Sequence, residues 1–168
     1  LGGVDLIAIS HPHFYSSMLE WSDAFGAPVL LHEADRNWVR RSSPAVGCWS
    51  GDEHQLSPTL RLLHLPGHFP GSAALLWSAA PGGRRALLAG DSLLVAADRR
   101  HVSVMHSVPN HVPVGPAVID DLARRLDGVQ FDDLYGFAWG GNVIGGADTA
   151  VAESLARYRS AITSPSLV

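Results

Sequence analysis

The feature that most constrains the fold is an alternation, along the whole chain, of short apolar segments with stretches of helical periodicity. This alternation favours a layered α/β architecture, because every element then has one apolar face to bury against a neighbouring layer. Apolar runs bounded by Gly, Pro and Ser predict strands over residues 4–9, 28–31, 59–65, 72–78, 85–89 and 134–139. Helical spacing predicts helices over residues 16–25, 33–40, 116–126 and 148–162.

The connections between these elements carry turn-forming residues. Pro81-Gly82-Gly83 lies between two predicted strands and favours a hairpin. Residues 42–58 are rich in Ser, Gly and Pro and are expected to form a loop with little regular structure, and a second long loop precedes the helix at 116–126. The chain has 168 residues, no repeat and no low-complexity tract, so we expect one domain over residues 1–168.

Composition narrows the function classes. Hydrophobic residues make up 46% of the chain and charged residues 17%, which argues against disorder. The formal net charge is −4 and no basic run exceeds two arginines, so a nucleic-acid partner is not expected. No apolar stretch reaches the roughly 18–20 residues of a membrane span. The single cysteine, Cys48, cannot form an internal disulfide and fits a reducing compartment, which favours a cytoplasmic location.

The first candidate for chemistry is the segment Ser10-His11-Pro12-His13, directly after the first predicted strand. Residues two apart on an extended segment point to the same side, and Pro12 favours an extended conformation at His11. The two imidazoles are therefore expected to face one point beyond the end of the strand.

Two further segments place a polar side chain at the end of an apolar strand. His68 lies within Gly67-His68-Phe69-Pro70-Gly71, a tight turn between two predicted strands, and Asp91 follows Gly90 at the end of another. Each segment alone is also typical of an ordinary turn.

The order of the three segments, H-x-H, then G-H-x-P-G-S, then an apolar strand ending in G-D, resembles the metallo-β-lactamase superfamily from about residue 4 to residue 162. The resemblance implies an αββα sandwich with a metal site at one edge of its two sheets. The strands that precede H-x-H in that superfamily are missing from this sequence. The chain also begins Leu1-Gly2-Gly3, without an initiator methionine, so we expect an N-terminally truncated domain.

Carried over residue by residue, the resemblance makes His11, His13, His68 and Asp91 the ligands of one divalent transition metal. Zinc is expected first, with iron or manganese as the other metals that suit this ligand set. No organic cofactor is implied.

The sequence departs from the superfamily at its second metal position. The family motif reads H-x-H-x-D-H, and here Tyr15 and Ser16 replace the aspartate and the last histidine. Residues 137–141, which match the region of the final family histidine, offer no ligand. The resemblance therefore implies a mononuclear site. Tyr15 is a candidate only for orienting a water molecule, because an ordinary phenol has a pKa of about 10.

The implied function is that of a metal-dependent hydrolase, in which a water bound to one metal ion attacks an ester, thioester or lactone-like carbonyl of a small molecule. Asp91 would be the fourth ligand or the proton acceptor. Two alternatives stay open: a mononuclear iron oxidoreductase of the persulfide-dioxygenase kind, and a non-catalytic member whose four ligands leave no open position. Association into a homo-oligomer is compatible with the sequence.

Other polar residues have plainer interpretations. The loop that carries His106 and His111 is a candidate lining of the pocket. Asp35 and Arg36 are expected on a solvated helical face, and His32 and His64 at the surface or at strand ends.

Overall fold

The larger of the two main sheets in the computed structural model, which describes residues 2–164, has six strands in the order β13-β12-β7-β6-β5-β4. Neighbours in this sheet run antiparallel, except that β12 is parallel to β7. The strands are β4 (Glu53–Ser57), β5 (Leu60–His64), β6 (Ala73–Ala80), β7 (Arg84–Gly90), β12 (Asp133–Gly136) and β13 (Asn142–Ile144). The hairpin expected around Pro81-Gly82-Gly83 joins β6 to β7 through a short 3-10 turn, η3 (Pro81–Gly83).

The smaller main sheet contains three parallel strands in the order β1-β2-β3. Helix α1 packs on it, and two 3-10 helices flank it. These elements are β1 (Ile7–Ala8), η1 (Pro12–Phe14), α1 (Met18–Phe25), β2 (Val29–His32), η2 (Glu33–Trp38) and β3 (Val46–Trp49). Helix α1 ends where predicted, because Gly26 adopts the left-handed conformation that closes a helix at low cost.

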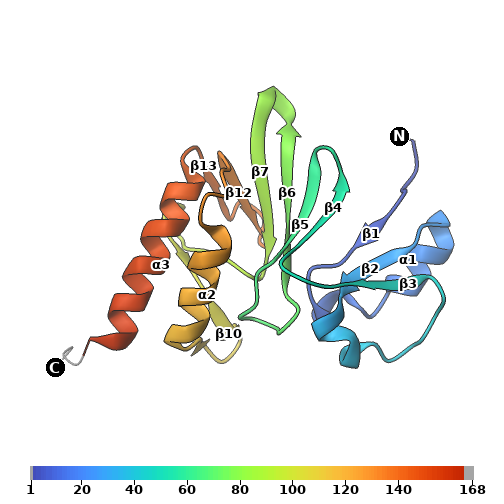
Figure 1. Cartoon of the computed structure of the whole chain (residues 1–168), viewed down its shortest axis with the longest axis horizontal. Coiled ribbons are helices and arrows are strands. Elements are labelled where there is room, and N and C mark those ends of the chain that lie inside the picture. Colours follow the sequence, from blue (N-terminus) through green and yellow to red (C-terminus); the bar gives the residue numbers. More distant parts are fainter. Residues whose placement is uncertain (1, 165–168) are drawn as a thin grey trace.

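Helices α2 (Pro116–Leu126) and α3 (Ala147–Thr163) cover the outer face of the six-stranded sheet, opposite the small sheet (Figure 1). The largest hydrophobic cluster lies under them and includes Leu87, Leu122 and Leu134, all fully buried. No helix within residues 2–164 is both long and apolar enough to cross a membrane.

Two smaller hydrophobic clusters fill the other layers. One lies between α1 and the small sheet, and it contains Tyr15, Met18, Val29 and Leu31. The other lies between the two sheets and contains Trp49, Leu62 and Ala73. The order of layers is thus helix, small sheet, large sheet, helices, and the predicted α/β layering is confirmed.

The small sheet covers only part of the facing surface. Leu75 of β6 packs against the cluster between the sheets, and it pairs in register with Leu88, which in turn pairs with Tyr135. Leu88 is 40% exposed and Tyr135 39% exposed. The face of the large sheet that looks towards the small sheet therefore remains partly open at β7 and β12.

Two sequence-based expectations about loops were wrong. Residues 42–58 contain strands β3 and β4, which pair with β2 and β5. The long loop before α2 contains two short hairpins. In both regions neighbouring strands supply the backbone hydrogen bonds, and local residue composition does not predict this pairing. The short strands are β8 (Leu94–Val95), β9 (Val102–Ser103), β10 (Met105–Ser107) and β11 (Val112–Pro113).

Candidate metal centre

The structure brings His11, His13, His68 and Asp91 together at one edge of the two main sheets. Each offers one ligand atom, and all four atoms lie within 4.8 Å of one another. His11 and His13 follow β1 of the small sheet, whereas His68 lies between β5 and β6 and Asp91 follows β7 of the large sheet. Across residues 2–164 this is the one group of three or more His, Cys, Asp or Glu side chains that could hold a metal ion.

The backbone before His11 is joined to the large sheet. His11 itself is extended, with φ −169°, and Pro12 starts η1, as the effect of proline on its predecessor predicts. The Ala73 amide of β6 donates to the Ser10 carbonyl at 2.9 Å. Gly90 has φ +53°, and a Cβ there would lie 3.0 Å from Ser10 Oγ. Ser10, which precedes His11, and Gly90, which precedes Asp91, are therefore packed against each other.

Hydrogen bonds fix how two of the rings present their nitrogens. His68 Nδ1 lies 3.3 Å from the Met105 carbonyl, which can only accept, so this nitrogen donates and Nε2 keeps its lone pair. His11 Nδ1 lies 2.9 Å from Ser10 Oγ, which leaves His11 Nε2 for the cluster. His13 Nδ1 faces His68 Nε2 at 3.3 Å. Partners outside the cluster thus orient the rings, as is usual for metal-binding histidines.

The geometry fits a tetrahedral metal ion. His11 Nε2 and Asp91 Oδ1 are buried and have no hydrogen-bond partner in the described part of the chain. Asp91 Oδ2 lies 3.4 Å from His11 Nε2 and 3.6 Å from His68 Nε2. Zn–N bonds of about 2.0–2.1 Å in a tetrahedron require ligand atoms about 3.3–3.4 Å apart. The fold and this cluster together indicate a divalent metal site.

The electrostatics also suit a cation. Burial alone would raise the pKa of Asp91, but the imidazoles of His11, His68 and His13 outweigh burial and hold it below its usual range. Burial, with His11 next in effect, lowers the pKa of His68 despite the opposing influence of Asp91. Near neutral pH the carboxyl group is therefore ionised and the His68 ring is neutral, which are the protonation states that ligate a metal.

Aromatic side chains surround the cluster. The Phe14 ring lies 4.9 Å from the His11 ring, and the Phe69 ring lies 5.0 Å from the His13 ring. Trp38 packs against Phe69 at 5.4 Å, and both Phe14 and Trp38 are exposed. His11 is buried, whereas His13 is exposed. The cluster is therefore reachable from solvent on the His13 side, past an apolar rim.

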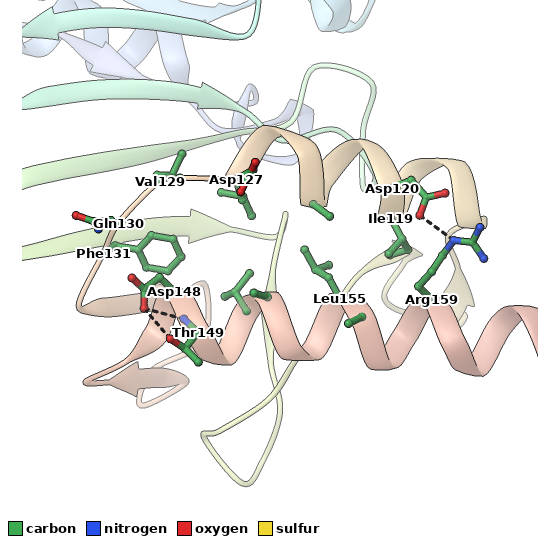
Figure 2. A pocket seen from close by; sticks show the side chains of 16 residues that line it. Ile119, Asp120, Asp127, Val129, Gln130, Phe131, Asp148, Thr149, Leu155 and Arg159 are labelled. Atoms are coloured by element: carbon green, nitrogen blue, oxygen red, sulfur yellow. Dashed lines mark hydrogen bonds and ion pairs between the residues drawn. The ribbon is translucent and has the colours of Figure 1, made fainter.

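An apolar groove of about 460 Å³ begins beside the cluster, at Ser10, Phe14 and Gly90, and runs between the sheets towards α1. A separate cavity of about 410 Å³ lies between α2 and α3 (Figure 2). The Asp120–Arg159 ion pair lies at one end of that cavity, and none of the four cluster residues lines it. The groove is thus adjacent to the candidate centre, whereas the cavity is not.

Tyr15, the sequence-based candidate for orienting a water, does not join the cluster. Its ring is buried with Met18 between α1 and the small sheet, and burial, followed by Asp35 and Cys48, raises the pKa of its hydroxyl above the usual value. The structure therefore does not support a catalytic role for Tyr15. Ser16, which stands where the family motif has its last histidine, is exposed.

The loop with His106 and His111, which was expected to line the pocket, contributes a backbone group to the centre. Its backbone approaches the centre, because the Met105 carbonyl accepts from His68. His106 and His111 are both exposed, and His111 lines a separate surface pocket with Tyr158. Backbone groups leave no signal in the sequence, so only the structure could identify Met105.

Asp35 contradicts the expectation of a solvated residue, since its exposed fraction is 0%. It accepts from the Gly71 amide at 2.8 Å, in the loop that carries His68. Its neighbour Arg36 is exposed as expected. The signal that could have located Asp35 is weak: it lies three residues after the end of the buried strand β2, whereas Asp91 directly follows β7.

No family model matches the chain. The chain is 43% identical over 164 residues to the uncharacterized protein YmaE of Bacillus subtilis (strain 168), a match that covers 98% of this chain and 60% of YmaE. The chain therefore spans about three fifths of the length of this curated relative.

Solved structures with similar folds are metallo-β-lactamases and related proteins. A B3 metallo-β-lactamase with an active-site glutamic acid matches with a TM-score of 0.62 and 16% identity, over 94% of this chain and 68% of that one. The metallo-β-lactamase SMB-1, in complex with mercaptoacetic acid, matches with a TM-score of 0.60 and 20% identity, over 93% of this chain and 72% of that one. An archaeal metallo-β-lactamase superfamily protein from Sulfolobus tokodaii matches with a TM-score of 0.59 and 14% identity, over 100% of this chain and 71% of that one. The chain has the metallo-β-lactamase fold that its motif order predicts.

Proposed function

We propose that this domain is a metal-dependent hydrolase that acts on an ester, thioester or lactone-like carbonyl. One divalent metal ion, zinc before iron or manganese, would be held by His11, His13, His68 and Asp91. The observation that carries the proposal is the convergence of four ligand atoms within 4.8 Å, two of them from each main sheet. Catalytic sites with mixed histidine and carboxylate ligands are typical of hydrolytic zinc enzymes.

A divalent metal ion bound here supplies a Lewis acid for a carbonyl oxygen and lowers the pKa of a water molecule to about 7. The protein's own contribution begins with the buried rings of His11 and His68, whose hydrogen bonds to Ser10 and Met105 fix their orientation. The pKa of Asp91 is held below its usual range, so its carboxyl group is ionised near neutral pH and is a weak base; its Oδ1, which has no partner within residues 2–164, could accept a hydrogen bond from a water molecule.

The surroundings favour a substrate with an apolar portion. Phe14 is exposed beside His11 and also lines the apolar groove, so one side chain joins the ligand cluster to that groove. An acyl or aryl group seated there would place its carbonyl near Asp91. The reacting groups would enter the cluster from the side of His13, which is exposed.

A second candidate, a non-catalytic metal site, is favoured by one observation. Three of the six separations among the ligand atoms, 3.3, 3.4 and 3.6 Å, are close to the edge length of a tetrahedron of ligands around one metal ion. A tetrahedral shell of four protein ligands leaves no position for water and is typical of structural zinc sites.

Elemental analysis of the purified chain tests the metal site, with His68→Ala and the exposed His111→Ala prepared in parallel. We expect about one zinc, iron or manganese per chain in the wild type and in His111→Ala, and its loss in His68→Ala. Absence of metal from the wild type after reconstitution would remove the proposal.

Hydrolysis of a nitrophenyl ester, a thioester and a lactone by the same three proteins then separates the two candidates. Turnover that is lost in His68→Ala and kept in His111→Ala supports the hydrolase. Metal binding without turnover of any of the three supports the non-catalytic site, and bound iron with oxygen consumption supports an oxidative enzyme.

A further inference from the structure

The carboxyl group of Asp35 is buried without a charged partner. Its exposed fraction is 0%, and it is the one buried residue of η2, in which Glu33 and Arg36 are exposed. Its Oδ2 has no hydrogen-bond partner among the described residues. A buried carboxyl group that is incompletely paired costs free energy, so a position of this kind requires a specific reason.

The partner of Asp35 is the backbone at Gly71. The Gly71 amide donates to Asp35 Oδ1 at 2.8 Å. A Cβ at Gly71 would lie 2.7 Å from Asp35 Cγ and 2.9 Å from the Asp35 backbone nitrogen. Any larger residue at 71 would therefore push η2 and the loop apart, and the contact requires glycine.

Gly71 belongs to the loop that carries His68 between β5 and β6. Within the loop, the Ser72 amide donates to the Phe69 carbonyl at 3.2 Å, and the Phe69 amide donates to Ser72 Oγ at 2.9 Å. These bonds set the shape of the turn, but they do not fix it relative to the small sheet. Asp35 does so, because η2 directly follows β2 of that sheet.

The two sheets supply different ligands, so their relative position decides whether the ligand atoms converge. His11 and His13 follow β1, which pairs with β2, and η2 continues from β2. The bond from Gly71 to Asp35 thus links the His68 loop to the layer that carries the other two histidines. His64 also bonds the loop, at the Pro70 carbonyl, but from the same sheet as His68.

We propose that Asp35 is a positioning residue for the metal centre, which holds His68 in register with His11 and His13 through the Gly71 amide. The inference rests on the proposed metal site and not on hydrolysis. Asparagine would keep the accepting oxygen and remove the charge, whereas alanine would remove both. The two substitutions therefore separate the hydrogen bond from the buried charge.

Cobalt binding provides the test, because Co²⁺ absorption reports ligand geometry without any need for activity. Wild type, Asp35→Ala, Asp35→Asn and Glu33→Ala are titrated with Co²⁺ after removal of other metals. Glu33 is an exposed acidic residue of the same helix and serves as the matched control. We expect Asp35→Ala to bind Co²⁺ roughly 10- to 100-fold more weakly and with an altered spectrum, as is usual when an orienting partner is lost. Asp35→Asn and Glu33→Ala should resemble the wild type.

A folded Asp35→Ala with wild-type affinity and spectrum overturns the proposal, as does an equal loss in Glu33→Ala. If Asp35→Ala does not fold, Gly71→Ala decides, because its Cβ displaces the same contact while the carboxylate stays. Weaker binding with the altered spectrum then supports the proposal, and unchanged binding overturns it. A wild type that binds no Co²⁺ removes both the metal site and this inference, whereas Co²⁺ binding without hydrolysis leaves the inference intact.

Discussion

Metal loading should raise the thermal stability of this domain by an amount that can be worked out in advance. A ligand that binds only the native state at 100 times its Kd stabilises by about 2.7 kcal/mol. For a domain of 168 residues, each kcal/mol corresponds to about 2–4 °C in Tm. We therefore expect Zn²⁺ at that concentration to raise Tm by about 5–11 °C.

The structure explains why the native state should bind and the unfolded state should not. His11 Nε2 and Asp91 Oδ1 are buried without partners within the described ranges, and each such atom costs about 1–3 kcal/mol when left unsatisfied. The ligands come from three segments that lie far apart in the sequence, at positions 11–13, 68 and 91, so only the folded chain brings all four together.

Differential scanning fluorimetry at pH 7.5, with and without Zn²⁺, measures the shift. His68→Ala removes one ligand, and His111→Ala removes an exposed histidine outside the cluster. The wild type and His111→Ala should show the full shift and His68→Ala little of it. Equal shifts in all three proteins would refute the reasoning, because they would mean that Zn²⁺ binds elsewhere.

Three further predictions test the packing and electrostatics. Leu87→Ala should cost about 2–5 kcal/mol in chemical denaturation, because Leu87 is fully buried, whereas Leu88→Ala on the opposite, 40% exposed face should cost about 1 kcal/mol. Burial lowers the pKa of His64, so the folded protein favours the neutral ring. The contribution of His64 to the free energy of unfolding should be complete above pH ~6.5 and should fall at lower pH, by at most about 1.4 kcal/mol per pH unit. The His64→Gln variant should show a smaller change in the free energy of unfolding over the same pH range. Gly90→Ala should lose about 1–2 kcal/mol from its left-handed backbone alone and more from contact with Ser10, with a lower Tm and a lower metal content by elemental analysis.

Much of the fold follows from local patterns. The helix at 116–126 has the predicted bounds, since Pro116 starts it and its apolar face is periodic, and the hairpin at residues 81–83 follows from its turn residues. The predicted strand at 4–9 is shortened to Ile7–Ala8, although the Ile9 amide still donates to the Leu30 carbonyl of β2 at 3.0 Å. Strand bounds depend on neighbours that are distant in the sequence, and periodicity does not report them.

The cluster was predictable for a different reason. Each of its ligands stands at the end of a strand or in the turn between two strands, and strand ends at one edge of a sheet gather in space. The sequence could not show which other residues orient or position these ligands. Ser10 and the Met105 carbonyl orient two rings, and Asp35 was expected in solvent. Their roles depend on contacts between layers, which no local pattern encodes.

The division of the ligands between the sheets connects the fold to the proposed chemistry. His11 and His13 come from the small sheet, whereas His68 and Asp91 come from the large one. The sheets are joined by the cluster around Trp49 and by hydrogen bonds between segments, and the facing surface is partly open at β7 and β12. An ion bound by all four would be a further link between the layers. The same ion would then serve both chemistry and stability, and substitutions at the centre should change the two together.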